Sequence, residues 1–234
     1  MSLSLTDAAR RAMAKLAADL QRVFEDRFVA LVAYGPTRTV GFARTLRADD
    51  LAALAPLADR WHREGLDTPL LLTPEEFSRS LDAFPLEYEA ILDRHELIAG
   101  ILPFGDVRPN DADLRRACEV QAQSFLIHLR QGWVHAADHH DDQIVLLQQS
   151  AAPLRALLSN VARLTGTSRA PLEDAALVKA VEDRIGLPGS VLAGVLALDA
   201  APDRAGHLLH APEFMPAYLL AAETLWTYID SWRR

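Results

Sequence analysis

The stretch FVALVAYGPTRTVGFARTL, residues 28–46, decides how the first part of the chain folds. It opens with an apolar run that ends at Tyr34, turns at Gly35 and Pro36, and continues into a second run that is mostly apolar. Apolar runs on both sides of a Gly-Pro pair predict two strands joined by a tight turn. We therefore expect this part of the chain to be built around a sheet.

The flanking sequence adds helices and a third strand. The predicted elements are a helix from a cap at Thr6 or Asp7 to about Glu25, a helix capped by Asp49 or Asp50 and stopped by Gly65, and a short strand over residues 69–72. The run Thr73-Pro74-Glu75-Glu76 has an N-cap residue, a first-turn proline and a glutamate three residues after the cap. This capping box predicts a helix from there to about residue 81.

Residues 84–92, FPLEYEAIL, alternate between apolar side chains and the two glutamates Glu87 and Glu89. Alternation with a period of two is typical of a strand with one polar face. We therefore expect a fourth strand here, with both glutamates on its solvated or site-facing side. With this strand, the first part of the chain is predicted to be an α/β half.

Beyond a loop at residues 103–110 the pattern is helical alone. Apolar residues recur with a helical period in five segments, about 111–137, 142–164, 172–185, 188–198 and 212–232. Pro153 is expected to kink the second segment or to mark a restart after Ser150, and residues 199–211 are expected to form a mobile loop. The predicted fold class is α+β, with a small mixed-sheet domain over residues 1–108 and an antiparallel helical bundle over residues 109–234.

Composition limits the partners of this chain. Its 234 residues are 50% hydrophobic, with a formal net charge of -8 and a pI near 5.5. The acidic balance argues against nucleic acid, which needs clustered cations, and no run of about 18 apolar residues is present to span a membrane. The single cysteine, Cys118, is expected to be a buried thiol in the reducing cytoplasm. Lysine occurs only at Lys15 and Lys179, a usage that points to a GC-rich bacterial gene.

The order of these elements, with an early strand that ends in Tyr34-Gly35, resembles the nucleotidyltransferase superfamily that includes DNA polymerase beta and the aminoglycoside nucleotidyltransferases. In that family the first strand ends in Gly-Ser, and the loop after it holds a nucleoside triphosphate. An Asp-x-Asp pair on the next strand and a third carboxylate one strand later bind two magnesium ions. The resemblance implies a nucleotide site beside the turn.

The chain departs from the family at the positions that carry this chemistry. Pro36 stands at the serine position and has neither a hydroxyl nor a backbone N–H for a phosphate, and residues 40–46 contain no carboxylate. We therefore expect no catalytic residue, no bound metal and no cofactor. The candidate ligand-binding residues are Gly35, Thr37 and Arg38 in the turn, Glu87 or Glu89 in place of the third carboxylate, and His95, whose imidazole is suited to act as a general base.

His135, His139 and His140, together with nearby aspartates, form the densest group of potential metal ligands in the chain. His135 and His139 have the i, i+4 spacing that lets two imidazoles share an ion. The same residues lie where one long helix is expected to end and the next to begin, a place where polar side chains cap helices and face water. We favour the solvated turn, and the metal site stays open.

These observations favour a non-catalytic protein that uses a nucleotidyltransferase-like fold to bind a small ligand or a protein partner of unknown identity. The apolar framework is intact while the chemistry of the family's site is lost. One alternative is an active nucleotidyltransferase that acts on a small molecule or a protein through Glu87 and Glu89 with rearranged metal ligands. Another is a self-associating protein whose helical half buries apolar faces against a second copy, which makes it a homo-oligomer.

Overall fold

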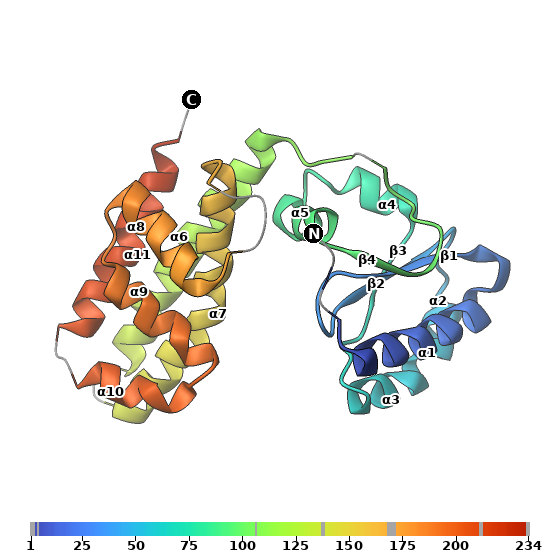
Figure 1. Cartoon of the computed structure of the whole chain (residues 1–234), viewed down its shortest axis with the longest axis horizontal. Coiled ribbons are helices and arrows are strands. Elements are labelled where there is room, and N and C mark those ends of the chain that lie inside the picture. The colour runs from blue at the N-terminus through green and yellow to red at the C-terminus, as the bar shows by residue number, and fades with distance from the viewer. Residues whose placement is uncertain are drawn as a thin grey trace. The chain divides into compact units, whose positions relative to one another are not determined.

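The computed structural model describes residue 3 and residues 5–105, 107–136, 139–167, 172–210 and 213–232. The chain divides into two compact units, Met1–Asn110 and Asp111–Arg234, each with hydrophobic core of its own. The first unit contains a mixed sheet with helices, and the second is made of helices (Figure 1). The α+β class expected from the sequence is confirmed at this level.

The first unit holds a four-stranded sheet in the order β3-β2-β1-β4. Its elements are α1 (Asp7–Phe24), β1 (Phe28–Ala33), β2 (Thr39–Ala43), α2 (Ala48–Leu54), α3 (Ala58–Arg63), β3 (Leu70–Leu72), α4 (Pro74–Arg79), α5 (Pro85–Asp93) and β4 (Glu96–Gly100). Strand β1 is antiparallel to β2 and to β4, and β2 is parallel to β3. Val32 of β1 pairs with Val40 on one side and with Leu97 on the other.

Strand β1 is buried on both of its faces. Ala30 and Val32 pack with side chains of α4 and α5, whereas Leu31 and Ala33 pack with side chains of α1, α2 and α3. Helices therefore cover both sides of the sheet (Figure 1). This explains why the sequence of β1 is a continuous apolar run and not an alternating one.

The strand predicted over residues 84–92 is wrong, because Pro85–Asp93 is helix α5. Tyr88, Ile91 and Leu92 are buried together at helical spacing, and the proline occupies the first turn, where it is well tolerated. The fourth strand of the sheet comes later, as β4, and was not expected from the sequence.

The predicted caps of α1 and α4 are confirmed, whereas the cap predicted at Asp49 or Asp50 is wrong, because α2 begins at Ala48 with Arg47 as its N-cap residue and both aspartates lie in its first turn. Thr6 caps α1 by accepting a hydrogen bond from the backbone N–H of Ala9 at 3.1 Å. At α4, Thr73 Oγ1 accepts from the N–H of Glu76 at 3.1 Å, and Glu76 Oε2 accepts from the N–H of Thr73 at 2.7 Å. The capping box thus forms as the sequence predicts.

Asp50 ties the start of α2 to the residue before β1. Its carboxylate accepts hydrogen bonds from the Arg27 guanidinium at 2.7 and 2.8 Å and from the backbone N–H of Arg47 at 2.9 Å. The hydrogen bonds from Arg27 lower the pKa of Asp50. The pair therefore stabilises the unit above the ordinary carboxyl pKa of about 4, and this contribution is lost as the pH falls through the lowered pKa.

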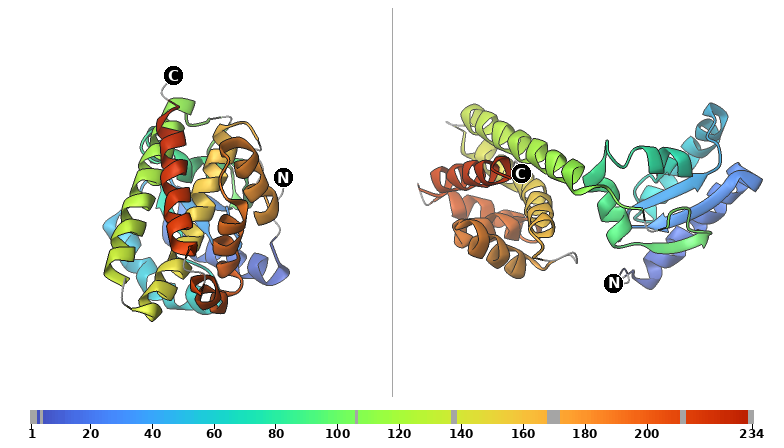
Figure 2. Two further views of the ribbon diagram at one scale, coloured as in Figure 1. Left: turned by 90° about the vertical axis from the view of Figure 1, so that its left-hand side faces the viewer. Right: turned by 90° about the horizontal axis from the view of Figure 1, so that it is seen from above.

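The second unit consists of helices packed around one apolar core. They are α6 (Asp111–Ala136), α7 (His140–Leu164), α8 (Asp174–Ile185), α9 (Gly189–Leu196), α10 (Ala205–Leu209) and α11 (Phe214–Asp230). Helix α6 packs against α7 and α11, which run beside it (Figure 2). The mobile loop predicted over residues 199–211 is wrong for its described part, because that part contains α10, with Ala205 fully buried.

Cys118 lies in the core of the second unit with none of its surface exposed, as the sequence predicts. Burial raises the pKa of this thiol to about 12, so the protein carries no reactive cysteine at neutral pH. Within the described ranges, no helix combines the length and the apolar character that a membrane span requires.

Phe77 is the centre of an aromatic cluster between the sheet and the helices α4 and α5. The centroid of its ring lies 4.5 Å from that of Tyr88, 5.1 Å from that of Phe104 and 5.6 Å from that of Phe42. We predict that Phe77→Ala lowers the free energy of unfolding of the first unit by about 3–5 kcal/mol, because it leaves a cavity in the cluster. Phe84→Ala, which removes a ring that is 54% exposed, should cost less than about 1 kcal/mol. Urea denaturation measures both, and equal losses would contradict the cluster's role.

Candidate functional site

In the turn between β1 and β2, the polar groups of Thr37 form hydrogen bonds with another residue of the same unit. The hydroxyl of Thr37 donates to Asp67 Oδ2 at 2.7 Å, and the backbone N–H of Asp67 donates to the Thr37 carbonyl at 3.0 Å. The Arg38 guanidinium lies over the Tyr34 ring, 5.1 Å from its centroid. A Cβ on Gly35 would lie 3.1 Å from Arg38 Nε, so the arginine side chain folds back over the position where a phosphate cradle was expected.

The other candidate residues in the first unit do not form a carboxylate site with this turn. Glu87 is exposed on α5, whereas Glu89 is buried within it, because residues two apart on a helix do not share a face. His95 Nδ1 lies 3.1 Å from the Ile91 carbonyl, and its ring contacts Phe104 edge-on at 5.2 Å between centroids. The six predicted residues thus make separate local contacts in the turn, in α5 and beside Phe104.

The histidine group at the end of α6 is divided between two helices. Because α6 ends at Ala136 and α7 begins at His140, His135 and His139 do not share a helix. Their i, i+4 spacing therefore does not place the two imidazoles on one helix face. The His140 ring lies 6.3 Å from that of His210 between centroids. In the part of the chain that the structure describes, no three His, Cys, Asp or Glu side chains are arranged to hold a metal ion, and Asp138 lies outside that part.

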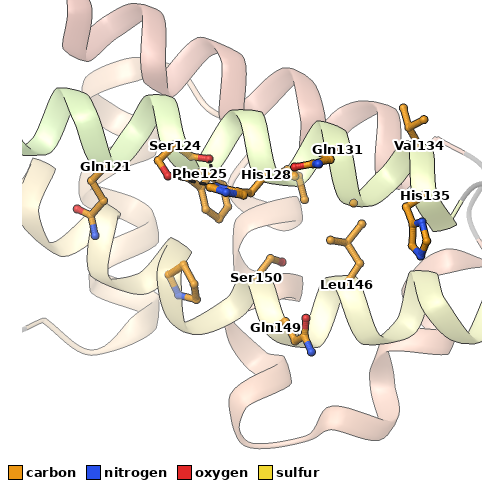
Figure 3. A pocket seen from close by; sticks show the side chains of 13 residues that line it. Gln121, Ser124, Phe125, His128, Gln131, Val134, His135, Leu146, Gln149 and Ser150 are labelled. Atoms are coloured by element: carbon orange, nitrogen blue, oxygen red, sulfur yellow. Dashed lines mark hydrogen bonds between the residues drawn. The ribbon is translucent and has the colours of Figure 1, made fainter.

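A groove of about 870 Å³ lies between α6 and α7 in the second unit (Figure 3). Its apolar lining comes from Phe125, Leu129, Val134, Leu146 and Pro153. Its polar lining comes from Gln121, Ser124, His128, Gln131, His135, Gln149 and Ser150. None of the described residues that line it is an Asp, Glu, Lys or Arg.

Two contacts between α6 and α7 fix the helices beside this groove. At one, a Cβ on Gly132 would lie 2.5 Å from Leu146 Cδ1, so glycine lets the two helices approach closely. At the other, the side-chain amide of Asn160 donates to Gln121 Oε1 at 2.9 Å. The two α6 residues are separated by about 16 Å along the helix axis. Both line the groove, which extends beyond Gly132 to His135.

Pro153 lies inside helix α7 and lines the groove. Helix α7 continues through this residue, so the restart predicted after Ser150 does not occur. Proline has no N–H, so residue 153 cannot donate the usual helical hydrogen bond to the Gln149 carbonyl. Gln149 also lines the groove.

Ser150 is held in place from behind by Tyr218 of α11. The buried Tyr218 hydroxyl donates to Ser150 Oγ at 2.9 Å, and Ser150 Oγ donates to the Leu147 carbonyl at 2.8 Å. Burial raises the pKa of Tyr218, so the phenol keeps its proton. Because the Ser150 proton is already committed, this hydroxyl can only accept a further hydrogen bond from the groove.

Ser124 and His128 lie next to each other on α6 but do not form a nucleophile and base (Figure 3). His128 Nδ1 lies 2.8 Å from the Ser124 carbonyl and 3.1 Å from Ser124 Oγ. A carbonyl only accepts hydrogen bonds, so Nδ1 carries the proton and cannot take one from the serine. The pair therefore offers hydrogen-bonding groups and no hydrolytic chemistry.

The groove was not predicted, although the sequence contains a signal for it. Residues 121, 124, 128, 131 and 135 are polar and uncharged and recur at helical spacing along α6. A row of amide, hydroxyl and imidazole groups beside an apolar face is a pattern of ligand-binding walls. Nothing in the sequence places α7 opposite this row.

Comparison with known proteins gives no relative: no family model, no curated protein and no solved structure matches this chain. The functional interpretation therefore depends on the residues and geometry described above.

The hydrogen bonds behind the groove predict an order of stability losses. Ser150→Ala leaves the buried Tyr218 hydroxyl without its acceptor and should cost about 1–3 kcal/mol of unfolding free energy. Tyr218→Phe removes the donor itself while Ser150 keeps its bond to Leu147, and should cost about 0.5–1.5 kcal/mol. Thermal and urea unfolding of both variants test this order. A larger loss in Tyr218→Phe than in Ser150→Ala would contradict it.

Proposed function

We propose that this protein is a non-catalytic binding module and that the groove between α6 and α7 binds an uncharged small organic molecule. The observation that carries the proposal is the lining of the groove: amide, hydroxyl and imidazole side chains stand beside apolar ones, and none of the described lining residues is an Asp, Glu, Lys or Arg. Such a combination binds an apolar body and orients it with a few polar contacts.

The size of the groove supports a small molecule. Sites for ligands of drug-like size typically measure about 300–1,000 Å³, and this groove measures about 870 Å³. The Leu146 side chain and the Phe125 ring supply apolar contact, while the three glutamines supply both donors and acceptors.

The same lining argues against a nucleoside triphosphate in this groove. Phosphate groups are bound by Arg, Lys, metal ions or arrays of backbone N–H groups, and none of these side chains occurs among the described lining residues. The proposed activity is therefore binding without phosphoryl chemistry.

Descent from the nucleotidyltransferase superfamily is part of this proposal. Strand β1, which is followed by Tyr34-Gly35, and the helical unit that follows the sheet support this proposal, and we interpret the helical unit as an antiparallel bundle. Pro36 and the internal bonds of Thr37 account for the loss of the phosphate site. A cytoplasmic location in a bacterium fits the buried thiol of Cys118 and the scarcity of lysine.

Nile red, an uncharged dye whose fluorescence rises in apolar surroundings, is the probe that tests the groove. We predict saturable binding of one dye per chain, weakened at least tenfold by Gln149→Trp, because the indole fills the groove from an exposed position. Tenfold corresponds to about 1.4 kcal/mol. Ala152→Trp is the matched control, since it adds the same ring at an exposed position of α7 outside the groove, and it should leave the affinity unchanged.

Equal binding by the wild-type protein and both variants would place the dye elsewhere and contradict the proposed site. Calorimetry with ATP, with and without magnesium, separates the transferase alternative. Magnesium-dependent binding of ATP that is lost in Glu87→Gln would establish that alternative and overturn the non-catalytic assignment.

A further inference from the structure

Two groups on opposite walls of the groove can accept a hydrogen bond from a ligand but cannot donate one. They are the imidazole of His128 on α6 and the hydroxyl of Ser150 on α7, and both residues line the groove (Figure 3). In each of them the proton that could be donated is bound by a backbone carbonyl of the same helix. These two groups therefore restrict which ligands fit, unlike an amide, which both donates and accepts.

The proton of the His128 imidazole lies on Nδ1. This nitrogen is 2.8 Å from the Ser124 carbonyl, one turn earlier on α6, and a carbonyl oxygen only accepts. A neutral imidazole has a single N–H, so the other nitrogen, Nε2, carries a lone pair. Among the described residues, none forms a hydrogen bond with Nε2. This nitrogen is an acceptor that is open to a ligand.

Ser150 Oγ has one lone pair left and no proton to donate. It donates to the Leu147 carbonyl at 2.8 Å and accepts from the Tyr218 hydroxyl at 2.9 Å. The residue is only 7% exposed, so water has little access to the remaining lone pair. A ligand that fills the groove without a donor for this oxygen would leave a buried acceptor unpaired, which weakens binding.

The packing of α6 against α7 brings these two acceptors to the same level of the groove. The helices run antiparallel, because their second contact lies further from the connection between them on both helices. His128 comes four residues before Gly132, and Ser150 comes four residues after Leu146, the residue that Gly132 approaches. Both acceptors are therefore about 6 Å from this approach in the same direction. Residues four apart share a helix face, so His128 and Ser150 lie opposite one another.

We propose that the groove binds an apolar molecule that carries two neighbouring hydroxyl groups, such as a catechol or a vicinal diol. This inference rests on the function proposed above. One hydroxyl donates to His128 Nε2 and the other donates to Ser150 Oγ, so that both acceptors are satisfied. Phe125, Leu129 and Pro153 supply apolar contact for the rest of the molecule.

The same arrangement disfavours ligands without such donors. Ketones, ethers and carboxylates present only acceptors, and two acceptors do not form a hydrogen bond with each other. A site that is built to bind a hydroxyl group rejects an analogue without it, because the polar groups of the site are then left unpaired. The glutamines of the groove both donate and accept, so they contribute less to this selectivity.

Displacement of Nile red by a matched pair of naphthalenes tests the selectivity. Naphthalene-2,3-diol carries the two donors, whereas 2,3-difluoronaphthalene has the same rings and no proton to donate. We expect the wild-type protein to bind the diol about tenfold more tightly, and we expect this preference to fall to about threefold in His128→Phe, which keeps a ring and loses the acceptor. Gln123→Phe is the matched control, because it adds the same ring at an exposed position of α6 outside the groove, and it should keep the full preference.

Equal affinities of the wild-type protein for the two naphthalenes would overturn this inference and leave the groove as a binding site. A preference that His128→Phe does not change, or that Gln123→Phe lowers as much, would do the same. Absence of Nile red binding, or binding that Gln149→Trp leaves unchanged, would instead overturn the proposed function and this inference with it.

The position of the imidazole proton tests the argument without a variant. Nuclear magnetic resonance of the wild-type protein with ¹⁵N-labelled histidine, at about pH 8, where a free imidazole is neutral, distinguishes a ring nitrogen that carries a proton from one that does not. We expect a proton on Nδ1 of His128 and none on Nε2, and we expect naphthalene-2,3-diol to change the chemical shift of Nε2. A proton on Nε2, or an Nε2 shift that the bound diol leaves unchanged, would overturn the inference.

Discussion

The packing of α6 against α7 is the interaction on which the groove depends. A Cβ at Gly132 would lie 2.5 Å from Leu146 Cδ1, so a larger residue there would require the Leu146 side chain to move. The hydrogen bond from Asn160 to Gln121 joins the same two helices further along. The groove runs along α6 from Gln121 to His135 and is lined by residues of both helices.

Helix α6 contributes to two parts of the unit at once. One face enters the core, where Cys118 and Leu129 are buried. Residues such as Ser124, His128 and Gln131 line the groove. A substitution on this helix can therefore affect both the stability of the unit and the binding of the proposed ligand.

The sequence predicts the elements that are fixed by local chemistry and fails where tertiary contacts decide. Thr73 and Glu76 identify their helix because a capping box is a local device. In residues 84–92 the two glutamates alternate with apolar residues at the period of a strand. The segment is nevertheless a helix, in which Tyr88 and Leu92 are buried on the same face. The groove could not be predicted from the sequence, because it depends on which residues of α7 pack against α6. A glycine such as Gly132 does not indicate which residue will lie opposite it.

The most direct test of the central claim is to map the Nile red site on the ¹⁵N-labelled protein by nuclear magnetic resonance. Our account predicts that chemical shifts change along α6 and α7, including the side-chain amides of Gln121, Gln131 and Gln149. It also predicts that the turn at residues 35–38 stays unchanged. Shift changes gathered at that turn, with α6 and α7 unaffected, would contradict the account and return the binding site to the nucleotidyltransferase-like position.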